Sequence, residues 1–459
     1  MPTLPFIAAA LAVATAFLVL GALSGRRVRS AADFGIAGRA ATATGVSGAL
    51  LGALVGGAST VGTAELAYQH GLSACWFTVG GGLGCLVLGV WLARPLRRSA
   101  LETIPQFLEK HYGRPVGLVV LAASSLGSFL SVVAQLIAGT ALMRTLAPSA
   151  PIAPVSAGAL IVVLTVGFAA AGGLKSYAAL GQAKIAALYA VCLACGAAAW
   201  SRGSTPSHLW AALPHETFFD PLSLGWTDAS AATSLVVGVL CTQIYVQAVF
   251  SASDERTART GALLSAALMP PLGALGIWVG LSMRASGLSV PPAQVLPAFL
   301  QLAFPAPIAG ALWAVLLLTV VGTAAGLGLG MATNLTRDLA PFRSESPWPG
   351  RVAFLGLVLL AAALALGRET PILAFSYLAM GLRGAGTFFP FLLAILWPGR
   401  LPARWALASS LLGLATLLLW PLTGLRFDPL FAGLSVSGLC IGSGVVLAAR
   451  PRLGGSTWS

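Results

Sequence analysis

The sequence predicts an all-α membrane protein with about thirteen transmembrane helices. Of its 459 residues, 57% are hydrophobic and only 8% are charged, and the mean hydropathy is +0.89. Soluble domains of this length do not have such a composition. The apolar residues form segments of roughly 20 residues or more, the length that a helix needs to cross a hydrocarbon core of about 30 Å. The 54 glycines suit helices that pack closely through small residues.

The predicted spans follow one another along the whole chain, separated by short polar connections. They cover residues 5–24, 42–68, 72–93, 115–146, 152–171, 175–200, 227–252, 259–285, 307–336, 351–366, 371–397, 405–425 and 430–449. A short amphipathic segment, residues 101–112, is expected to lie along the inner interface. The longer connection at residues 201–226 contains three prolines and is expected to form an outer loop with a short helix.

Basic residues occur in alternate connections, which predicts the orientation of the chain. The first connection contains Arg26, Arg27, Arg29 and Arg39, whereas residues 147–151 carry no charge. We therefore expect a multi-pass protein of a bacterial inner membrane, with the N-terminus outside and the C-terminus in the cytoplasm. The net charge of +13 is explained by these connections, so nucleic acid is not an expected partner. The lipid bilayer is the expected environment, and no obligate protein partner is evident.

The second span, residues 42–68, is predicted to be an interrupted helix. Its middle reads Gly-Gly-Ala-Ser-Thr from Gly56 to Thr60, which forms helix poorly, and Glu65 follows within two turns. Unpaired backbone groups in hydrocarbon cost several kcal/mol, so a broken helix persists only where it lines a cavity inside the protein. We expect the freed carbonyl groups to face a site near the middle of the bilayer.

Other ionisable and polar residues at membrane depth are candidates for the same site. Lys184 and Arg383 lie well inside spans, and Thr319 and Thr323 lie in the ninth. Ionisable residues at this depth mark transport pathways, although Glu65 could instead pair with one of the two cations and join helices. A threonine in a helix can equally bond its own backbone. Polar side chains in the seventh span are expected to line a cavity; they are Thr242, Gln243, Tyr245 and Gln247.

Several classes of function are disfavoured by what the sequence does not contain. There is no GxxxxGK[ST] motif to bind ATP, and no group of residues suited to nucleophilic or metal catalysis at depth, so an enzyme is not expected. Cys192 and Cys195 form a CxxC inside an apolar span without a neighbouring histidine, which favours packing over metal binding. No cofactor is expected, with Na⁺ as the one candidate ion.

Five short motifs, in order along the chain, resemble the sodium:solute symporter family, which includes proline, pantothenate and sugar symporters. Residues 31–39 (AADFGIAGR) resemble S-x-DFxxAGR, and residues 103–113 (TIPQFLEKHYG) resemble TIPEFLxxRYG. Residues 172–175 (GGLK) resemble GGLKA, residues 253–258 (SDERTA) resemble AAKDExTA, and residues 334–339 (NLTRDL) resemble xxTxDLY. Each motif is weak alone, but their common order and predicted topology make the resemblance specific.

The resemblance implies a LeuT-type fold with two inverted five-helix repeats related by an axis in the membrane plane. The first helix and inner loop would be residues 1–41, the repeats 42–200 and 227–398, the outer loop 201–226, and the two C-terminal helices and tail 399–459. It also implies an Na⁺ site between the second and ninth spans. Its ligands would be the carbonyl oxygens of Ala58, Val61 and Thr319 and the side chains at Gly322 and Thr323.

The chain departs from the family pattern at this implied site. Members that bind Na⁺ usually carry two hydroxyl groups where this chain has Gly322 and Thr323, and an aspartate where it has Gly181. Lys184 lies one helical turn from Gly181, at a position where the family often has glutamine. Two interpretations remain open. Lys184 could replace Na⁺ and couple transport to H⁺, or Na⁺ could bind with water completing its shell.

We therefore expect a secondary active transporter that couples uptake of a small organic solute to Na⁺ or H⁺ by alternating access. The excess of buried cations favours a carboxylate or an amino acid as the solute. The candidate substrate contacts are Glu65, Thr242, Gln243, Gln247 and Arg383. Two other functions remain open: a channel-like pathway that equilibrates a solute without accumulating it, and a sensor or scaffold that binds ligand without transport.

Overall fold

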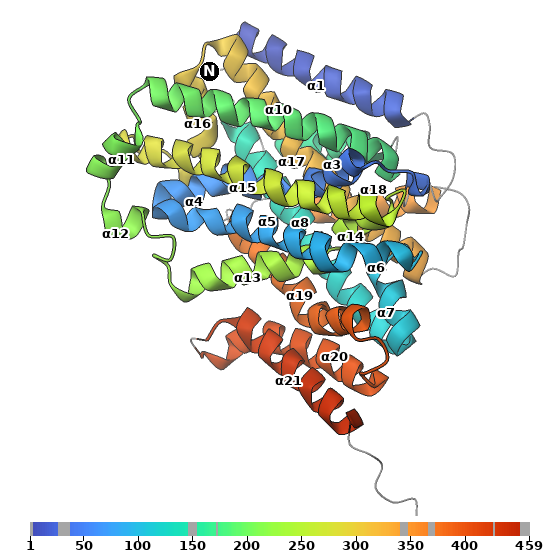
Figure 1. Ribbon diagram of the computed structural model, residues 1–459. Coiled ribbons are helices and arrows are strands. Elements are labelled where there is room, and N and C mark those ends of the chain that lie inside the picture. The colour runs from blue at the N-terminus through green and yellow to red at the C-terminus, as the bar shows by residue number, and fades with distance from the viewer. Residues whose placement is uncertain are drawn as a thin grey trace, which may run out of the picture.

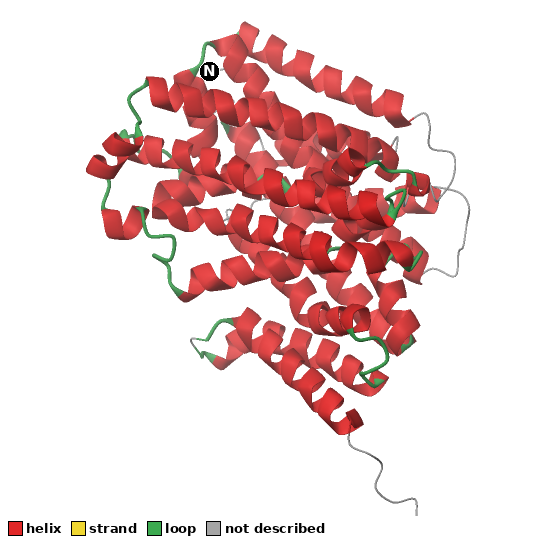
Figure 2. Ribbon diagram, in the orientation of Figure 1, coloured by secondary structure: helices red, strands yellow, loops and turns green. Residues whose placement is uncertain are grey.

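The computed structural model describes residues 3–25, 37–145, 154–170, 173–339, 348–365, 372–425 and 427–449. Within these ranges the regular elements are helices (Figure 2). An isolated parallel bridge joins Ala41 to Ala252. The all-α prediction is therefore confirmed. Three basic residues of the first connection, residues 31–36 of the first motif, Gly172 and the connection 147–151 lie outside the described residues.

The helices follow the order of the predicted spans (Figure 1). They are α1 (Leu4–Gly25), η1 (Ala37–Arg39), α3 (Ala43–Leu54), η2 (Ala58–Gly62), α4 (Thr63–His70), η3 (Gly71–Cys75), α5 (Trp76–Val87), η4 (Leu88–Leu92), α6 (Ala93–Arg98), α7 (Ile104–Tyr112), α8 (Arg114–Arg144), α9 (Pro154–Ala170), α10 (Gly173–Ser201), α11 (Pro206–Ala212), α12 (His215–Phe218), α13 (Trp226–Cys241), α14 (Gln243–Phe250), α15 (Glu255–Ala285), η5 (Pro292–Gln294), α16 (Val295–Ala303), α17 (Ala306–Asn334), η6 (Leu335–Leu339), α18 (Trp348–Ala365), α19 (Ile372–Leu396), α20 (Ala403–Leu419), η7 (Trp420–Thr423) and α21 (Pro429–Ala449).

Every predicted span contains a helix or an interrupted helix, but the count of thirteen is not established. Among the described residues, nine helices are long and apolar enough to cross a membrane, or up to 10 when a bent pair is joined. The expected outer loop contains two short helices, α11 and α12. A further short helix, α16, was not predicted, because it lies in a connection that has no long apolar run.

The helix α17 lies at the centre of the molecule. In its most apolar 18-residue window 83% of the residues are buried, compared with 28% in α18 and in α20. It packs against α1, α8 and α10 and contacts α3. The last two helices, α20 and α21, pack mainly on each other and on α19, and form a separate layer in Figure 1. A site beside α17 is therefore surrounded by protein.

The short helix α7 shows how local sequence signals position one inner element. The Thr103 hydroxyl accepts a hydrogen bond from the backbone N–H of Gln106 at 3.1 Å and caps its start, and Pro105 lies in its first turn. Gly113 ends it at a φ of +89°, a conformation that favours glycine. The predicted amphipathic helix is confirmed, and its apolar face packs on α8.

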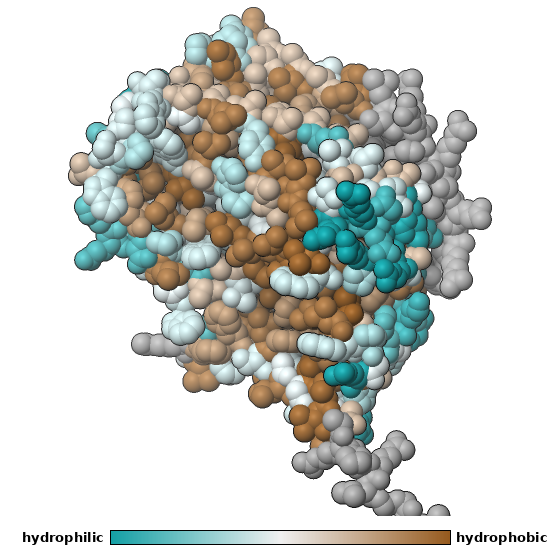
Figure 3. Space-filling model, in the orientation of Figure 1, coloured by the Kyte–Doolittle hydropathy of each residue, from teal (hydrophilic) through white to brown (hydrophobic). Residues whose placement is uncertain are grey.

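The surface is apolar along the helices and hydrophilic towards their ends. Figure 3 shows apolar residues along the helix bodies, with hydrophilic residues gathered near the end where Figure 1 labels α6. This distribution is typical of a multi-pass membrane protein, whose helix bodies face lipid and whose connections face water.

Candidate cation and substrate sites

The predicted interruption of the second span is present. The α3 helix ends at Leu54, and Val55 adopts an extended conformation with φ −89° and ψ +99°. A π-helical turn, η2, then leads into α4. Side chains replace the missing helical partners: the Ser59 hydroxyl accepts from the N–H of Gly56 at 2.9 Å, and Gln135 Oε1 accepts from the N–H of Gly57 at 2.8 Å.

The two glycines are needed because neighbouring helices approach this backbone closely. A Cβ atom at Gly56 would lie 2.7 Å from both Gln135 Oε1 and Thr323 Oγ1, and one at Gly57 would lie 2.6 Å from the Ala138 methyl carbon. Such contacts are shorter than side-chain packing tolerates. The glycines therefore let the interrupted backbone reach α8 and α17.

Lys184 lies between the interrupted helix and α17. Its Nζ donates hydrogen bonds to the Gly52 carbonyl at 2.6 Å and to Thr323 Oγ1 at 2.7 Å. Thr323 Oγ1 in turn donates to the Val55 carbonyl at 2.9 Å. Lys184 is 1% exposed, and no salt bridge joins it to a carboxylate among the described residues. A buried ammonium group therefore binds the end of α3 through neutral oxygen atoms.

The other predicted ion ligands lie in η2 and α17 and are not hydrogen-bonded to Lys184. The Ala58 carbonyl accepts from Thr63 Oγ1 at 3.2 Å. The Thr319 hydroxyl donates to the Val315 carbonyl of its own helix at 2.7 Å. This is the bond to its own backbone that was the alternative to ion binding for a threonine in a helix. Val61 is buried in η2, and Gly322 provides no side chain. Only Thr323 of the predicted set bonds the lysine, and the ion-binding roles remain predictions.

A second interruption, which the sequence analysis did not identify, separates α13 from α14. Thr242 is extended, with φ −91° and ψ +122°, and the helices on its two sides are inclined by 45°. The break contains neither glycine nor proline. The sequence signal nearest to it is the cluster of polar residues that begins at Thr242, which predicts the lining of a cavity but not a break.

Arg383 contacts this second interruption. Its guanidinium donates to Thr242 Oγ1, to Ser131 Oγ and, at 2.9 Å, to the Gly127 carbonyl. The side chain is 0% exposed, its Nε has no hydrogen-bond partner, and no described carboxylate forms a salt bridge with it. The structure therefore places one unpaired cation beside each interrupted helix.

The remaining candidate substrate contacts are more dispersed than predicted. Gln243 binds the start of α7: its Oε1 accepts from the N–H of Ile104 and its Nε2 donates to the Glu102 carbonyl, both at 3.0 Å. Gln247 Nε2 donates to Thr333 Oγ1 at 3.2 Å. Glu65 is half-buried in α4 and forms no salt bridge with Lys184 or Arg383. Within the set, a hydrogen bond joins Arg383 to Thr242.

Comparison with known proteins identifies the family. The sequence pattern of the Sodium:solute symporter family matches residues 34–413, most of the chain. The chain belongs to the sodium:solute symporter family. This member is therefore a transporter rather than an enzyme, and cation-coupled symport is its general activity. No curated protein sequence matches it significantly.

Solved structures show that this symporter has the predicted LeuT-type fold. A Na⁺-coupled sialic acid symporter in a substrate-bound outward-open state matches with a TM-score of 0.80 and 17% identity, covering 98% of each chain. MhsT in complex with L-phenylalanine matches with a TM-score of 0.57 and 18% identity over 88% of this chain and 98% of that one. Mhp1, a nucleobase-cation-symport-1 family transporter, matches with a TM-score of 0.54 and 15% identity, covering 91% of this chain and 94% of that one.

Two of the family motifs, which are more than 200 residues apart, meet at one end of this symporter. Thr103 at the start of α7 donates a hydrogen bond to Asp338 Oδ1 in η6 at 2.9 Å. The neighbouring residues Glu102 and Arg337 form a salt bridge of 3.1 Å. Both motifs are evident in the sequence, but their contact is not predicted by it. Together with Gln243, they connect α7, α14 and the end of α17.

Proposed function

We propose that this symporter couples uptake of a small organic anion to H⁺, with the Lys184 ammonium group in the place of a coupling Na⁺. The observation that carries the proposal is the pair of hydrogen bonds from Lys184 Nζ to the Gly52 carbonyl and Thr323 Oγ1. Carbonyl and hydroxyl oxygens beside a broken helix are the groups that coordinate Na⁺ in transporters of this architecture. Here an amine already uses two of them.

A proton on Lys184 would act as the coupling ion in the following way. The ammonium group stabilises the end of α3 by charge-assisted hydrogen bonds, which are stronger than those of a neutral amine. Release of the proton to the inner side would weaken the contact between α3 and α17 and favour the next state of the cycle. Ionisable groups inside membrane helices often act as proton relays of this kind.

Arg383 supports an anionic solute. A buried charge without a counter-ion is costly, so an unpaired guanidinium is expected where a ligand supplies the opposite charge. Its planar group binds carboxylates with two parallel hydrogen bonds, and Nε has no partner in the described structure. We propose a carboxylate or an amino acid as the solute, bound at the Arg383 guanidinium beside Thr242, with Glu65 as the partner of an amino group.

The mechanism would be alternating access between the two five-helix repeats, residues 42–200 and 227–398, in a bacterial inner membrane with the C-terminus in the cytoplasm. Both interrupted helices carry a cation contact, one in each proposed repeat. Binding of solute at one and of a proton at the other would therefore bias the same rearrangement, which is the condition for coupling.

The first experiment identifies a solute by thermal stabilisation of the purified protein. Pyruvate, lactate, succinate, proline, alanine and glucose are added in Na⁺-free buffer at several pH values, because a ligand that binds the folded state raises its melting temperature. We expect a carboxylate or amino acid to stabilise the protein without Na⁺. Stabilisation by glucose alone would contradict the proposed solute class.

The second experiment measures uptake of that solute into proteoliposomes. We expect accumulation with an inward H⁺ gradient in the absence of Na⁺, and its loss in Lys184→Gln, while solute exchange across equal concentrations continues. Uptake driven by a Na⁺ gradient without a pH gradient, and retained in Lys184→Gln, would establish the alternative that the family relationship favours, namely Na⁺ coupling. Equilibration without accumulation would indicate a facilitative pathway, and ligand binding without flux a sensor.

A further inference from the structure

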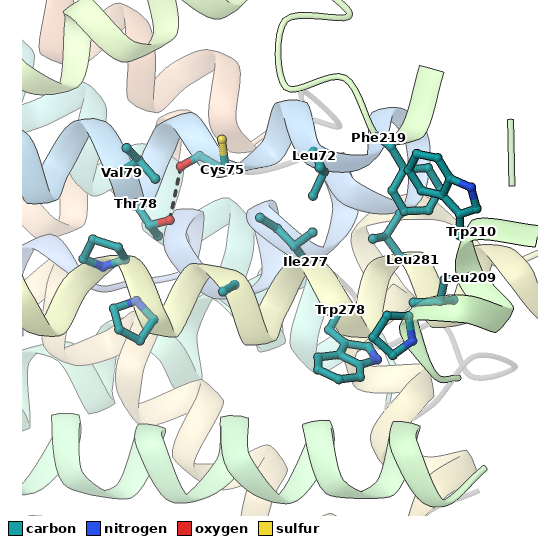
Figure 4. Close-up of a pocket in the computed structure, with 14 residues that line it drawn as sticks. Leu72, Cys75, Thr78, Val79, Leu209, Trp210, Phe219, Ile277, Trp278 and Leu281 are labelled. Carbon is teal, nitrogen blue, oxygen red and sulfur yellow. Dashed lines mark hydrogen bonds between the residues drawn. The ribbon is translucent and has the colours of Figure 1, made fainter. Parts of the chain in front are cut away.

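A pocket of about 680 Å³ lies away from both cation sites, between η3 and α5 on one side and α15 on the other (Figure 4). Leu72, Cys75, Thr78 and Val79 line the first wall, and residues between Pro270 and Leu281 line the second. Helix α11 and Phe219 contribute the side chains at one end, where Trp210 and Leu209 are labelled. Neither the cation contact of Lys184 nor that of Arg383 includes any of these residues.

The lining of this pocket is mostly apolar. Thr78 has the one hydroxyl group among the lining residues, and it already donates to the Cys75 carbonyl at 3.2 Å. The indole N–H of Trp278 donates to the Ser204 carbonyl at 2.9 Å. These two polar groups are thus satisfied within the protein. Apart from the Cys75 thiol and the Trp210 indole N–H, the ligand would meet aliphatic, proline and aromatic side chains. A sugar or an amino acid would lose its hydrogen bonds with water on entering.

The pocket opens on the surface. Trp210 on its rim is 52% exposed, and Pro271 and Ala274 are also exposed. The adjoining part of α5 presents Leu83 and Leu86 outward, which indicates a surface that faces hydrocarbon. Components of the bilayer itself would therefore have direct access to this opening.

The length of the pocket matches one bilayer leaflet. Pro270 is near the middle of α15, which runs from Glu255 to Ala285, and Leu281 is near its end. These positions are separated by about 16 Å along a helix with a rise of 1.5 Å per residue. Half of a hydrocarbon core is about 15 Å thick. An acyl chain entering at the end of α15 would therefore extend to the middle of the membrane.

A cation stands at the end where a lipid headgroup would lie. Arg284 follows Leu281 by three residues, so both lie on the same face of α15. The side chain is exposed, and its guanidinium is stacked 5.5 Å from the Tyr68 ring centre and 5.6 Å from that of Phe218. Aromatic stacking orients the group and leaves its N–H edge available for a phosphate.

We propose that this pocket binds one acyl chain of an anionic glycerophospholipid, with the lipid phosphate on Arg284. The hydrocarbon would fill the space between α5 and α15, and the headgroup would lie beside α12. A lipid held there would contact α15 and the turn η3 at once. Because it rests on residues outside the transport sites, the inference is independent of the proposed coupling ion and solute.

Photo-crosslinking in nanodiscs tests the acyl-chain site. The protein is embedded in phosphatidylcholine containing a small fraction of phosphatidylglycerol that carries a diazirine at the end of one acyl chain. After irradiation, labelled peptides are quantified by mass spectrometry. We expect labelling of peptides that contain residues 72–79 and 270–281. In Ala274→Trp, which fills the pocket, this labelling should fall at least fivefold, whereas Leu83→Trp on the outer face of α5 should leave it unchanged.

Two further comparisons decide the proposal. Arg284→Gln should reduce labelling by phosphatidylglycerol severalfold but change labelling by diazirine-bearing hexadecane little, since hexadecane has no phosphate. Equal labelling of wild type, Ala274→Trp and Leu83→Trp would overturn the acyl-chain site. Labelling by phosphatidylglycerol that Arg284→Gln leaves unchanged would overturn the headgroup contact. An unchanged melting temperature in each variant shows that a loss of labelling does not result from unfolding.

Discussion

The cations near the helix ends and the cations inside the molecule bind different partners. Arg98 forms a bidentate salt bridge with Glu255, both bonds being 2.9 Å long, and Arg337 pairs with Glu102 at 3.1 Å. Lys184 and Arg383, by contrast, bind carbonyl and hydroxyl oxygens, and no described carboxylate pairs with either.

This difference separates two uses of positive charge in one protein. In a salt bridge near water each charge is already neutralised by its partner, so the pair needs no further ligand. A buried cation held by neutral oxygens keeps its full charge and attracts an anion or responds to loss of a proton. We therefore expect changes at the buried cations to abolish transport, and changes at the peripheral pairs to alter stability slightly.

The largest effect is expected at Arg383. Arg383→Gln should reduce uptake of the identified carboxylate at least a hundredfold, because the solute loses its charged partner. Arg383→Lys retains the charge but not the planar pair of donors, and should also lose most uptake. Uptake into proteoliposomes measures both, with Arg98→Gln as the control that should transport normally. Normal transport by Arg383→Gln would mean that the buried guanidinium is structural.

A smaller effect distinguishes two threonines of the same helix. Thr323→Ala removes the hydroxyl that bonds Lys184 and the Val55 carbonyl, and should lower coupled uptake roughly tenfold. Thr319→Ala removes a hydroxyl that bonds only its own helix, and should change uptake less than twofold. The ratio of H⁺-driven accumulation to solute exchange measures the coupling. Equal effects of the two substitutions would remove the Lys184 contact from the mechanism.

The salt bridge between Glu102 and Arg337 is expected to contribute to stability. Its side chains are 23% and 24% exposed, so water screens the pair only in part. Glu102→Gln and Arg337→Gln should each lower the melting temperature. The double variant should lose less unfolding free energy than the two single variants together, and the difference, the coupling energy of the pair, should be about 1 kcal/mol. Strict additivity in this double-mutant cycle would show that the two charges do not stabilise each other.

The smallest expected effect concerns Asp254, which caps α15 outside the membrane-spanning segments. Its carboxylate accepts from the N–H and hydroxyl of Thr257 at 2.8 Å and 2.7 Å, and these hydrogen bonds lower its pKa to about 2. Because the folded pKa is below the ordinary value of 3.8, the stabilisation is present above pH 4 and is lost as the pH falls towards 2.

The melting temperature of wild type should therefore exceed that of Asp254→Ala near neutral pH, and the difference should shrink as the pH is lowered from 5 towards 2. Thr42→Ala, which removes the uncharged cap of α3, should give a difference that does not vary with pH. A constant difference for Asp254→Ala would show that its charge does not contribute to the cap.

The helices and the first interruption could be predicted because their physical causes are local. Hydrophobic runs indicate spans directly, and the sequence from Gly56 to Thr60 has low helix propensity wherever it occurs. The break at Thr242 could not be predicted in this way, since its residues are compatible with a helix. There the Arg383 guanidinium, 141 residues away, bonds the Thr242 hydroxyl at the break.

The candidate site could likewise be predicted only in part from the sequence. Lys184 was identified because a lysine at that depth departs from the family pattern, and its contact with Thr323 agrees with the implied geometry. The roles of Gln243 and Gln247 were not accessible, since an amide in a membrane helix can line a cavity or join two elements. The partners that decide between these roles are far away in the sequence.

The attachment of Gln243 to the start of α7 has a mechanical consequence. Both ends of its amide bond the backbone of residues that precede or open that helix, and Thr103 ties the same point to Asp338. If α14 tilts about Thr242 while the solute crosses, it must either break these hydrogen bonds or move α7 with it. The short inner helix α7 would then transmit the tilt of α14 to η6 at the end of α17.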